Sequence, residues 1–191
     1  QQLSYNNAYL KNYYTISLSL NERILFEYQK KKSFSKIDSI NSKLTKMLSV
    51  LTVTSNNTTY KEILSTGHLN TINNDTLRKS IGTFYLLTEL LESSINGNID
   101  NVFYAELFPI IRSSVMIDFK KFNLDSSKVL LKNYPKKLNS IIANKWKNPS
   151  DELALVNALS LRMVVLHNAK GSLESINTGA EKMIKLLDKH I

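Results

Sequence analysis

Apolar residues recur every three or four positions along most of this chain, the spacing at which side chains share one face of an α-helix. The first clear run lies within residues 2–52 and consists of Ile37, Ile40, Leu44, Met47, Leu48 and Leu51. Upstream of this run, Leu and Tyr residues also occupy positions between the repeats, so the apolar face is less well defined. We therefore predict one long helix over residues 2–52, with a bend or register change at Ser17–Asn21.

A polar segment is predicted to end this helix. Residues 54–59 read TSNNTT, and such small polar residues favour turns. A short helix is predicted from about Thr59 to Thr66. Gly67 follows at the position where helices often end in a left-handed conformation, which glycine adopts at no steric cost. Gly67 is thus predicted to be a structural C-cap.

A connector then leads into a second long helix, predicted over residues 75–96. The connector is predicted to be non-helical, with Leu69 and Ile72 as the apolar residues that anchor it to the core. Asn73, Asn74 and Asp75 carry the side-chain oxygens that cap helix N-termini, and Asp75 is among the structural residues we predict. The apolar seam predicted for this helix is Leu77, Ile81, Phe84, Thr88, Leu91 and Ile95.

Gly97 is predicted to close that helix, and a further helix is expected over Ile99–Phe119. Pro109 falls inside the latter range, and proline lacks the N–H that an interior helical position requires. We therefore predict either a kink or a helix restart with Pro109 in its first turn. Residues 123–147 are predicted to form two short helices that are broken at Tyr134–Pro135.

The last helix has the clearest start signal. Asn148 offers a capping oxygen, and Pro149 suits the first helical position. Asp151 and Glu152 bring negative charge to the positive end of the helix. The helix is predicted to run to about Lys189. Its apolar face is Leu159, Met163, Leu166, Leu173, Ile176, Ala180, Met183 and Leu187.

Composition supports a helical fold. The 191 residues include only five Gly and three Pro, too few for the many tight turns of a β-sandwich or barrel. The hydrophobic share of 42% is that of a globular protein, and no linker or repeat interrupts the chain. We predict a single all-α domain over residues 1–191, an elongated antiparallel helical bundle whose first and last helices are long and run antiparallel.

The sequence offers little recognisable reaction chemistry. There is no Cys, and His68, His167 and His190 have no partners at metal-ligand spacing. A glycine-rich phosphate loop and a nucleophile elbow are also missing. We therefore predict no enzymatic activity, no metal and no cofactor. An enzyme with an unrecognised site remains an alternative, and its weak candidates are His68, Asp75 and Arg78 beside the Gly67 connector.

The net charge of +9 is unevenly distributed. One acid-poor stretch contains Lys30, Lys31, Lys32 and Lys36, and another contains Lys128, Lys132, Lys136, Lys137, Lys145 and Lys147. Such segments can attract anionic lipid, nucleic acid or an acidic protein, or they can be ordinary solvated helix surface. We favour the solvated surface, and nucleic-acid binding through residues 28–36 and 128–147 is a less favoured alternative.

The first helix has apolar residues on more than one face between Leu3 and Tyr28. One intramolecular seam cannot cover such a wide surface, and wide coverage often marks a partner surface. Residues 3–28 are therefore predicted to form a homodimer contact or to pack against a protein partner. The alternative is that this part bends near Ser17–Asn21 and folds back on its own domain.

Residues from position 60 onward resemble an uncharacterised bacterial family, a domain of unknown function. The matching connector residues are Tyr60, Leu64, Ser65, Gly67, Leu69, Ile72, Asn74, Asp75, Leu77, Arg78, Ile81, Phe84 and Tyr85. Leu107–Phe108–Pro109 is similar to the family's leucine–proline–aromatic helix, and Asn148 to Leu166, with Asn157, Leu159 and Arg162, is similar to its final helix. Thr66 and His68 depart from the commoner Ser and Lys, and Phe84 replaces a usual Tyr.

The resemblance implies a helical domain held by one N-terminal membrane helix, which would lie upstream of Gln1. The basic N-terminus of such proteins stays inside the cell, which would place the domain on the extracytoplasmic, periplasmic side. No activity is assigned to the family. We therefore expect a membrane-anchored extracytoplasmic module that acts as a non-enzymatic interaction or sensor-like domain.

Overall fold

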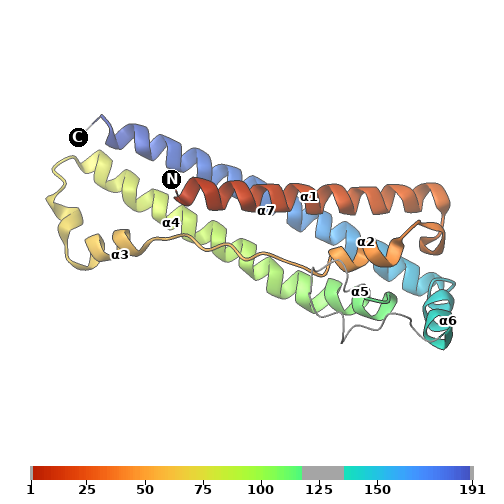
Figure 1. Cartoon of the computed structure of the whole chain (residues 1–191). Coiled ribbons are helices and arrows are strands. Elements are labelled where there is room, and N and C mark those ends of the chain that lie inside the picture. The colour runs from red at the N-terminus through yellow and green to blue at the C-terminus, as the bar shows by residue number, and fades with distance from the viewer. Residues whose placement is uncertain (1, 118–135, 190–191) are drawn as a thin grey trace, which may run out of the picture. The chain divides into compact units, whose positions relative to one another are not determined.

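The computed structural model describes residues 2–117 and 136–189, and every element within these ranges is helical (Figure 1). The long helices are α1 (Gln2–Lys31), α4 (Asp75–Asn98) and α7 (Pro149–Leu187). The shorter elements are η1 (Phe34–Lys36), α2 (Ile40–Lys46), α3 (Thr58–Ser65), η2 (His68–Thr71), η3 (Ile99–Leu107), α5 (Phe108–Ser114) and α6 (Lys136–Lys145). The predicted all-α class, with long first and last helices, is confirmed.

The described chain forms two compact units, each assembled from separate stretches of sequence. The first unit contains residues 1–15, 51–97 and 167–191, and the second contains residues 16–50 and 98–166. The long helices α1 and α7 each contribute residues to both units. The prediction of a single domain stays a prediction.

The first helix is shorter than predicted, because α1 ends at Lys31. Lys32 and Ser39 both adopt left-handed φ angles, 56° and 54°, which an α-helix does not allow. The cause is tertiary: Phe34 is fully buried, stacks on Tyr28 at a ring-centroid distance of 4.3 Å and contacts the tilted ring of Trp146 at 5.5 Å. The chain must leave the helix to place Phe34 there.

The prediction of one helix over residues 2–52 was therefore wrong, whereas its apolar spacing did identify core positions. Ile37, Ile40, Leu44 and Met47 are buried, but they lie on a connection, on α2 and at its C-terminal end rather than along one helix. No interruption occurs at Ser17–Asn21, where α1 is continuous. Residues 49–57 follow without helical structure.

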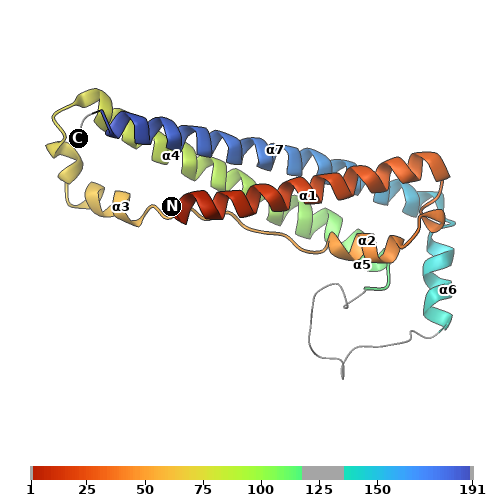
Figure 2. The ribbon, with the colours of Figure 1, turned by 45° about the horizontal axis from the view of Figure 1, so that its top comes forward.

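The core of the second unit gathers residues from α1, α2, η3, α5 and α7. Its buried members are Ile24, Phe34, Ile37, Ile40, Leu44, Met47, Phe103, Leu107, Ile111, Val115, Trp146, Leu155, Ala158 and Leu159. Helix α2 lies beside α5 (Figures 1 and 2), and both contribute to this core. Within the unit, α1 and α7 run antiparallel, because Asn21 bonds to Leu159 while Tyr28 bonds to Glu152.

The N-terminus of α7 is built as the sequence predicts. Asn148 Oδ1 accepts the N–H of Ser150 at 3.1 Å, and Pro149 is the first helical residue. Glu152 has a further role, because its carboxylate accepts bonds from Ser33 Oγ at 3.1 Å and from the N–H of Phe34 at 3.4 Å. The first turn of α7 thereby holds the connection that follows α1.

Tyr28 also contacts the Glu152 carboxylate, with 3.4 Å between its hydroxyl and Oε2. Burial, together with the negative charge of Glu152, raises the pKa of the Tyr28 hydroxyl. Burial disfavours the phenolate, and the neighbouring carboxylate repels it. Tyr28 is therefore a neutral hydrogen-bond donor in this contact.

Glu27 forms a bridge between α1 and α2. Its Oε1 lies 2.7 Å from Lys43 Nζ and 3.2 Å from Arg23 Nε. The hydrogen bond and the charge of Lys43, aided by Arg23, lower the pKa of Glu27 from the ordinary value of 4.5. The ionised carboxylate is thus favoured in the folded state.

Acidification is expected to remove this contribution to stability. A folded-state pKa below the unfolded value means that the stabilisation is complete above about pH 4.5 and is lost as the pH falls through the lower, folded-state pKa. Urea unfolding of the wild type and of Glu27→Gln, followed by circular dichroism between pH 7 and pH 3, should show the difference in stability shrinking in this window. A difference that stays constant with pH would contradict the assignment.

The chain passes from α4 into α5 without the predicted break at Gly97. Helix α4 continues to Asn98 and is followed by η3, a π-helix, in which the N–H of Phe108 bonds to the carbonyl of Phe103. Pro109 lies in the first turn of α5, as one of the two predicted alternatives had it, but the helical backbone continues through this point. In a regular α-helix, Pro109 would clash with the carbonyl four residues earlier, and the wider π turns accommodate it.

Helix α5 ends at Ser114, earlier than the predicted Phe119, which lies outside the described residues. The predicted break at Tyr134–Pro135 also lies outside them, as do Lys128, Lys132 and His190. Helix α6 corresponds to the second of the two short helices predicted over residues 123–147.

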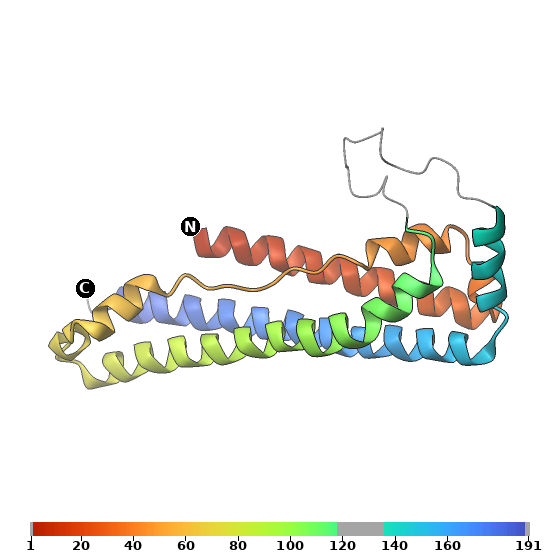
Figure 3. The same cartoon turned by 90° about the horizontal axis from the view of Figure 1, so that it is seen from below.

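In the first unit, the extended segment before α3 is tied to α4. Asn96 accepts the N–H of Val53 at 3.0 Å and donates to its carbonyl at 2.8 Å. Tyr60 stacks on Tyr85 with their ring centroids 4.0 Å apart. In the same unit, α4 and the second half of α7 lie side by side (Figure 3).

Candidate functional site

The connector between α3 and α4 carries the polar residues that the sequence singled out. Gly67 has a φ of 74°, the left-handed conformation predicted for it. Leu69 and Ile72 are half-buried rather than buried in a core. The cap of α4 comes from Asn74, whose Oδ1 accepts the N–H of Leu77 at 3.0 Å. Asp75, predicted as a cap, is instead the first residue of the helix.

His68, Asp75 and Arg78 make only local contacts. Arg78 pairs with Asp75 one turn earlier and donates to the carbonyl of Ile72 at 3.4 Å. His68 Nδ1 lies 2.7 Å from the hydroxyl of Thr66, in its own turn. Arg78 thus holds the connector against the start of α4, which is a structural role. None of the three lines the groove between α4 and α7 that is described below.

The described residues contain no group of three or more His, Cys, Asp or Glu side chains that could hold a metal ion. Within the same residues, no helix has the length and apolar character required to cross a lipid bilayer.

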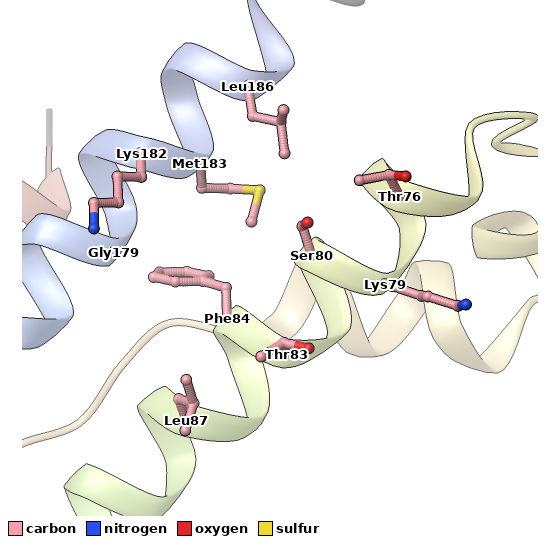
Figure 4. A pocket seen from close by; sticks show the side chains of 10 residues that line it. All are labelled: Thr76, Lys79, Ser80, Thr83, Phe84, Leu87, Gly179, Lys182, Met183 and Leu186. Atoms are coloured by element: carbon pink, nitrogen blue, oxygen red, sulfur yellow. The ribbon is translucent and has the colours of Figure 1, made fainter.

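A groove of about 460 Å³ in the first unit lies between α4 and α7 (Figure 4). Its lining residues are Thr76, Lys79, Ser80, Thr83, Phe84, Leu87, Gly179, Lys182, Met183 and Leu186. Phe84 and Met183 point into the space between the helices (Figure 4). The Phe84 ring lies close to the backbone of Gly179. A side chain at position 179 would crowd the ring, because a Cβ there would lie only 3.2 Å from it.

The groove combines an apolar floor with positive charge. Lys79 stands on the α4 side and Lys182 on the α7 side, and no acidic residue lines the groove. Neither lysine forms an ion pair with a described residue. Lys185, on the next turn of α7, and Lys189, just after the helix ends, continue the basic character.

Exposed leucines extend the apolar surface along α4. Leu87, which lines the groove, is 52% exposed, and Leu86 and Leu90 are 58% and 57% exposed. Leu90 lies one helical turn beyond both of the others, so the three form a continuous strip. Exposed apolar side chains that cluster beside a groove mark a binding surface more often than isolated ones do.

Sequence reasoning missed this groove. It assigned Phe84 to the bundle seam, and nothing local indicated that Gly179 would lie against that ring. A signal was nevertheless present, because the pairs Leu86–Leu87 and Leu90–Leu91 make the apolar face of α4 wider than a single seam.

Sequence reasoning also missed the role of Arg162, which lies on the apolar face of α7 and is only 4% exposed. Its guanidinium donates to the carbonyls of Met47 at 2.8 Å and Ser49 at 3.4 Å, and lies 5.0 Å from the ring centroid of Phe103. Arg162 therefore caps the C-terminal end of α2.

Comparison with protein-family models, with curated proteins and with solved structures finds no match for this chain. The resemblance to the uncharacterised bacterial family stays a prediction.

Proposed function

We propose that this protein is a non-enzymatic interaction module whose groove between α4 and α7 binds an acidic amphipathic helix of a partner protein. In the same proposal, the module is anchored to a membrane by a helix N-terminal to residue 1 and lies on the extracytoplasmic side. The anchor and the location rest on the family resemblance of residues 60–190. The binding role rests on the groove itself.

The observation that carries the binding role is the apolar floor with lysines on both sides. Phe84, Met183 and Leu87 offer a surface for the apolar face of a helix, the usual mode in which grooves recognise helical segments. Lys79 and Lys182 favour an occupant with acidic flanks and disfavour one with basic flanks. The α4 lining extends from Thr76 to Leu87, about 16 Å at the helical rise of 1.5 Å per residue, and so suits a helix of about three turns.

Two labelled peptides test this proposal. Both carry leucines along one helical face, and one has Glu on the flanks whereas the other has Lys. Fluorescence anisotropy should show that the Glu peptide binds more tightly. The double substitution Lys79→Glu and Lys182→Glu should reverse this preference, with a change of about tenfold or more in the ratio of the two affinities.

A matched control is the double substitution Lys46→Glu and Lys170→Glu, which changes the net charge equally but leaves the groove lining intact. This control should keep the preference of the wild type. Equal reversal by the control would mean that net charge rather than the groove selects the peptide. Failure of both peptides to bind the wild type would overturn the binding role.

The predicted contact through residues 3–28 stays a prediction. Part of this helix packs on its own chain, since Leu10, Tyr14 and Ile24 are buried. Other apolar side chains, Tyr9, Ile16 and Phe26, are more than half exposed and remain available to a partner or to a second copy.

A further inference from the structure

A cluster of lysines in the second unit has no part in the groove. Lys30, Lys31, Lys32 and Lys36 surround the connection after α1, while Lys145 and Lys147 flank Trp146 at the end of α6. The contact of Phe34 with Trp146 and the bond of Ser33 to Glu152 bring these two segments together. We refer to these six lysines as the basic end.

Some of this charge is compensated locally. Lys31 lies 3.5 Å from Asp38, and Lys145 lies 3.3 Å from Asp151. Two other nearby carboxylates are engaged elsewhere: Glu152 accepts bonds from Ser33 and Phe34, and Glu27 pairs with Lys43 and Arg23. Lys30 and Lys31 also suit the negative C-terminal end of α1.

Four lysines of the basic end have no carboxylate partner among the described residues. Lys30, Lys32, Lys36 and Lys147 are exposed, and none forms an ion pair with another described residue. Holding four like charges on one small surface opposes folding slightly, because they repel one another. An anionic partner would relieve this repulsion.

Two exposed apolar side chains accompany these lysines. The Phe26 ring is 55% exposed and lies 4.3 Å below Lys30 Nζ. Ile141 is 62% exposed on α6, one turn from both Lys137 and Lys145. Apolar side chains among lysines are typical of surfaces that enter the interface of a lipid bilayer.

We propose that the basic end binds the surface of an anionic phospholipid bilayer. All six charges come from Lys, whose compact ammonium group acts as a point charge. Nucleic-acid phosphates are more often held by the bidentate guanidinium of Arg. A bilayer instead uses both the diffuse positive charge and the aliphatic side chain.

Vesicle sedimentation of the whole chain tests this inference. Binding is expected to vesicles that contain phosphatidylglycerol, and not to vesicles of phosphatidylcholine alone. High salt should release the protein, because the interaction depends on charge. The triple substitution Lys32→Gln, Lys36→Gln and Lys147→Gln should lower the partition coefficient about a hundredfold, since each lysine near an anionic surface contributes about fivefold.

The control triple Lys170→Gln, Lys185→Gln and Lys189→Gln removes the same charge from the C-terminal part of the first unit. It should retain most of the binding, and an equal loss would overturn the assignment to the basic end. Ile141→Ser should weaken binding severalfold without changing its salt dependence. An unchanged partition coefficient for this variant would contradict insertion of the side chain.

Three further results would overturn the proposal. One is sedimentation that does not depend on phosphatidylglycerol. Another is displacement by soluble glycerol phosphate at matched concentration, which would indicate a pocket for single anions rather than a bilayer surface. The third is a gel shift with single- or double-stranded nucleic acid that the lysine triple variant abolishes, while vesicles fail to bind. None of these results bears on the peptide groove, so the two proposals can fail separately.

Discussion

Replacing Arg162 by Met is expected to lower the free energy of unfolding by about 3 kcal/mol, because the buried carbonyl of Met47 and the partly buried carbonyl of Ser49 lose their donor. Met retains much of the side-chain volume but cannot bond to the carbonyls of Met47 and Ser49. The cation–π contact of the Arg162 guanidinium with the Phe103 ring is lost as well. Urea unfolding followed by far-ultraviolet circular dichroism would measure the change.

Two companion variants sharpen this prediction. Arg162→Lys keeps the charge but lacks the planar fork, so it should recover only part of the loss. Arg23→Met is the matched control, because the Arg23 side chain is 71% exposed, and its effect should stay within about 0.5 kcal/mol. Stability of Arg162→Met equal to that of this control would show that the carbonyls of α2 do not need the guanidinium.

Phe34→Ala is expected to destabilise the protein by about 3 to 5 kcal/mol, the range for truncation of a fully buried aromatic ring. The substitution leaves a cavity beside Tyr28, which stacks on Phe34, and Trp146, whose tilted ring contacts Phe34. Trp146 is the single tryptophan of the chain, so its fluorescence reports directly on this site. A red-shifted emission and an earlier unfolding midpoint are expected.

Phe26→Ala provides the comparison, since Phe26 is also a phenylalanine of the second unit but lies on α1 and is 55% exposed. Its loss should cost no more than about 1 kcal/mol and should leave the emission of Trp146 unchanged. An equally small loss of stability for Phe34→Ala, with unchanged Trp146 emission, would contradict the prediction. It would mean that burial of Phe34 is not the reason why α1 ends at Lys31.

The position of the candidate groove could not be predicted from sequence, although its components could be recognised. The apolar residues of α4 and α7 were identified by their spacing, and Phe84 and Met183 were both assigned to apolar faces. What was missing was the register between two helices that lie far apart in the chain. That register places Gly179 against Phe84 and leaves Leu87 at the edge. It depends on packing along the whole length of both helices.

Arg162 illustrates a second limit. A lone Arg on an apolar helical face gives no local sign of its partners, which belong to the end of α2. Sequence reasoning could place the residue on the face, but only the fold shows that it satisfies backbone carbonyls there. The same holds for Glu152, which looked like a helix-start acid and also binds Ser33, 119 residues away.

The sequence by itself determined the features that arise within a few residues. These are the all-helical class, the left-handed turn at Gly67 and the helix start at Asn148–Pro149. Each follows from backbone conformations and hydrogen-bonding groups that a residue and its close neighbours fix on their own.

Only the tertiary structure decided where α1 ends, how the chain passes Gly97, and which faces of α4 and α7 remain open. Helical spacing continues past Lys31, but burial of Phe34 against Trp146 outweighs the local preference for helix. Gly97 could have closed α4, yet packing of Ile99 and Phe103 carries the helix on into η3. The physical reason is that burying large apolar side chains contributes more free energy than the helix propensity of a single residue.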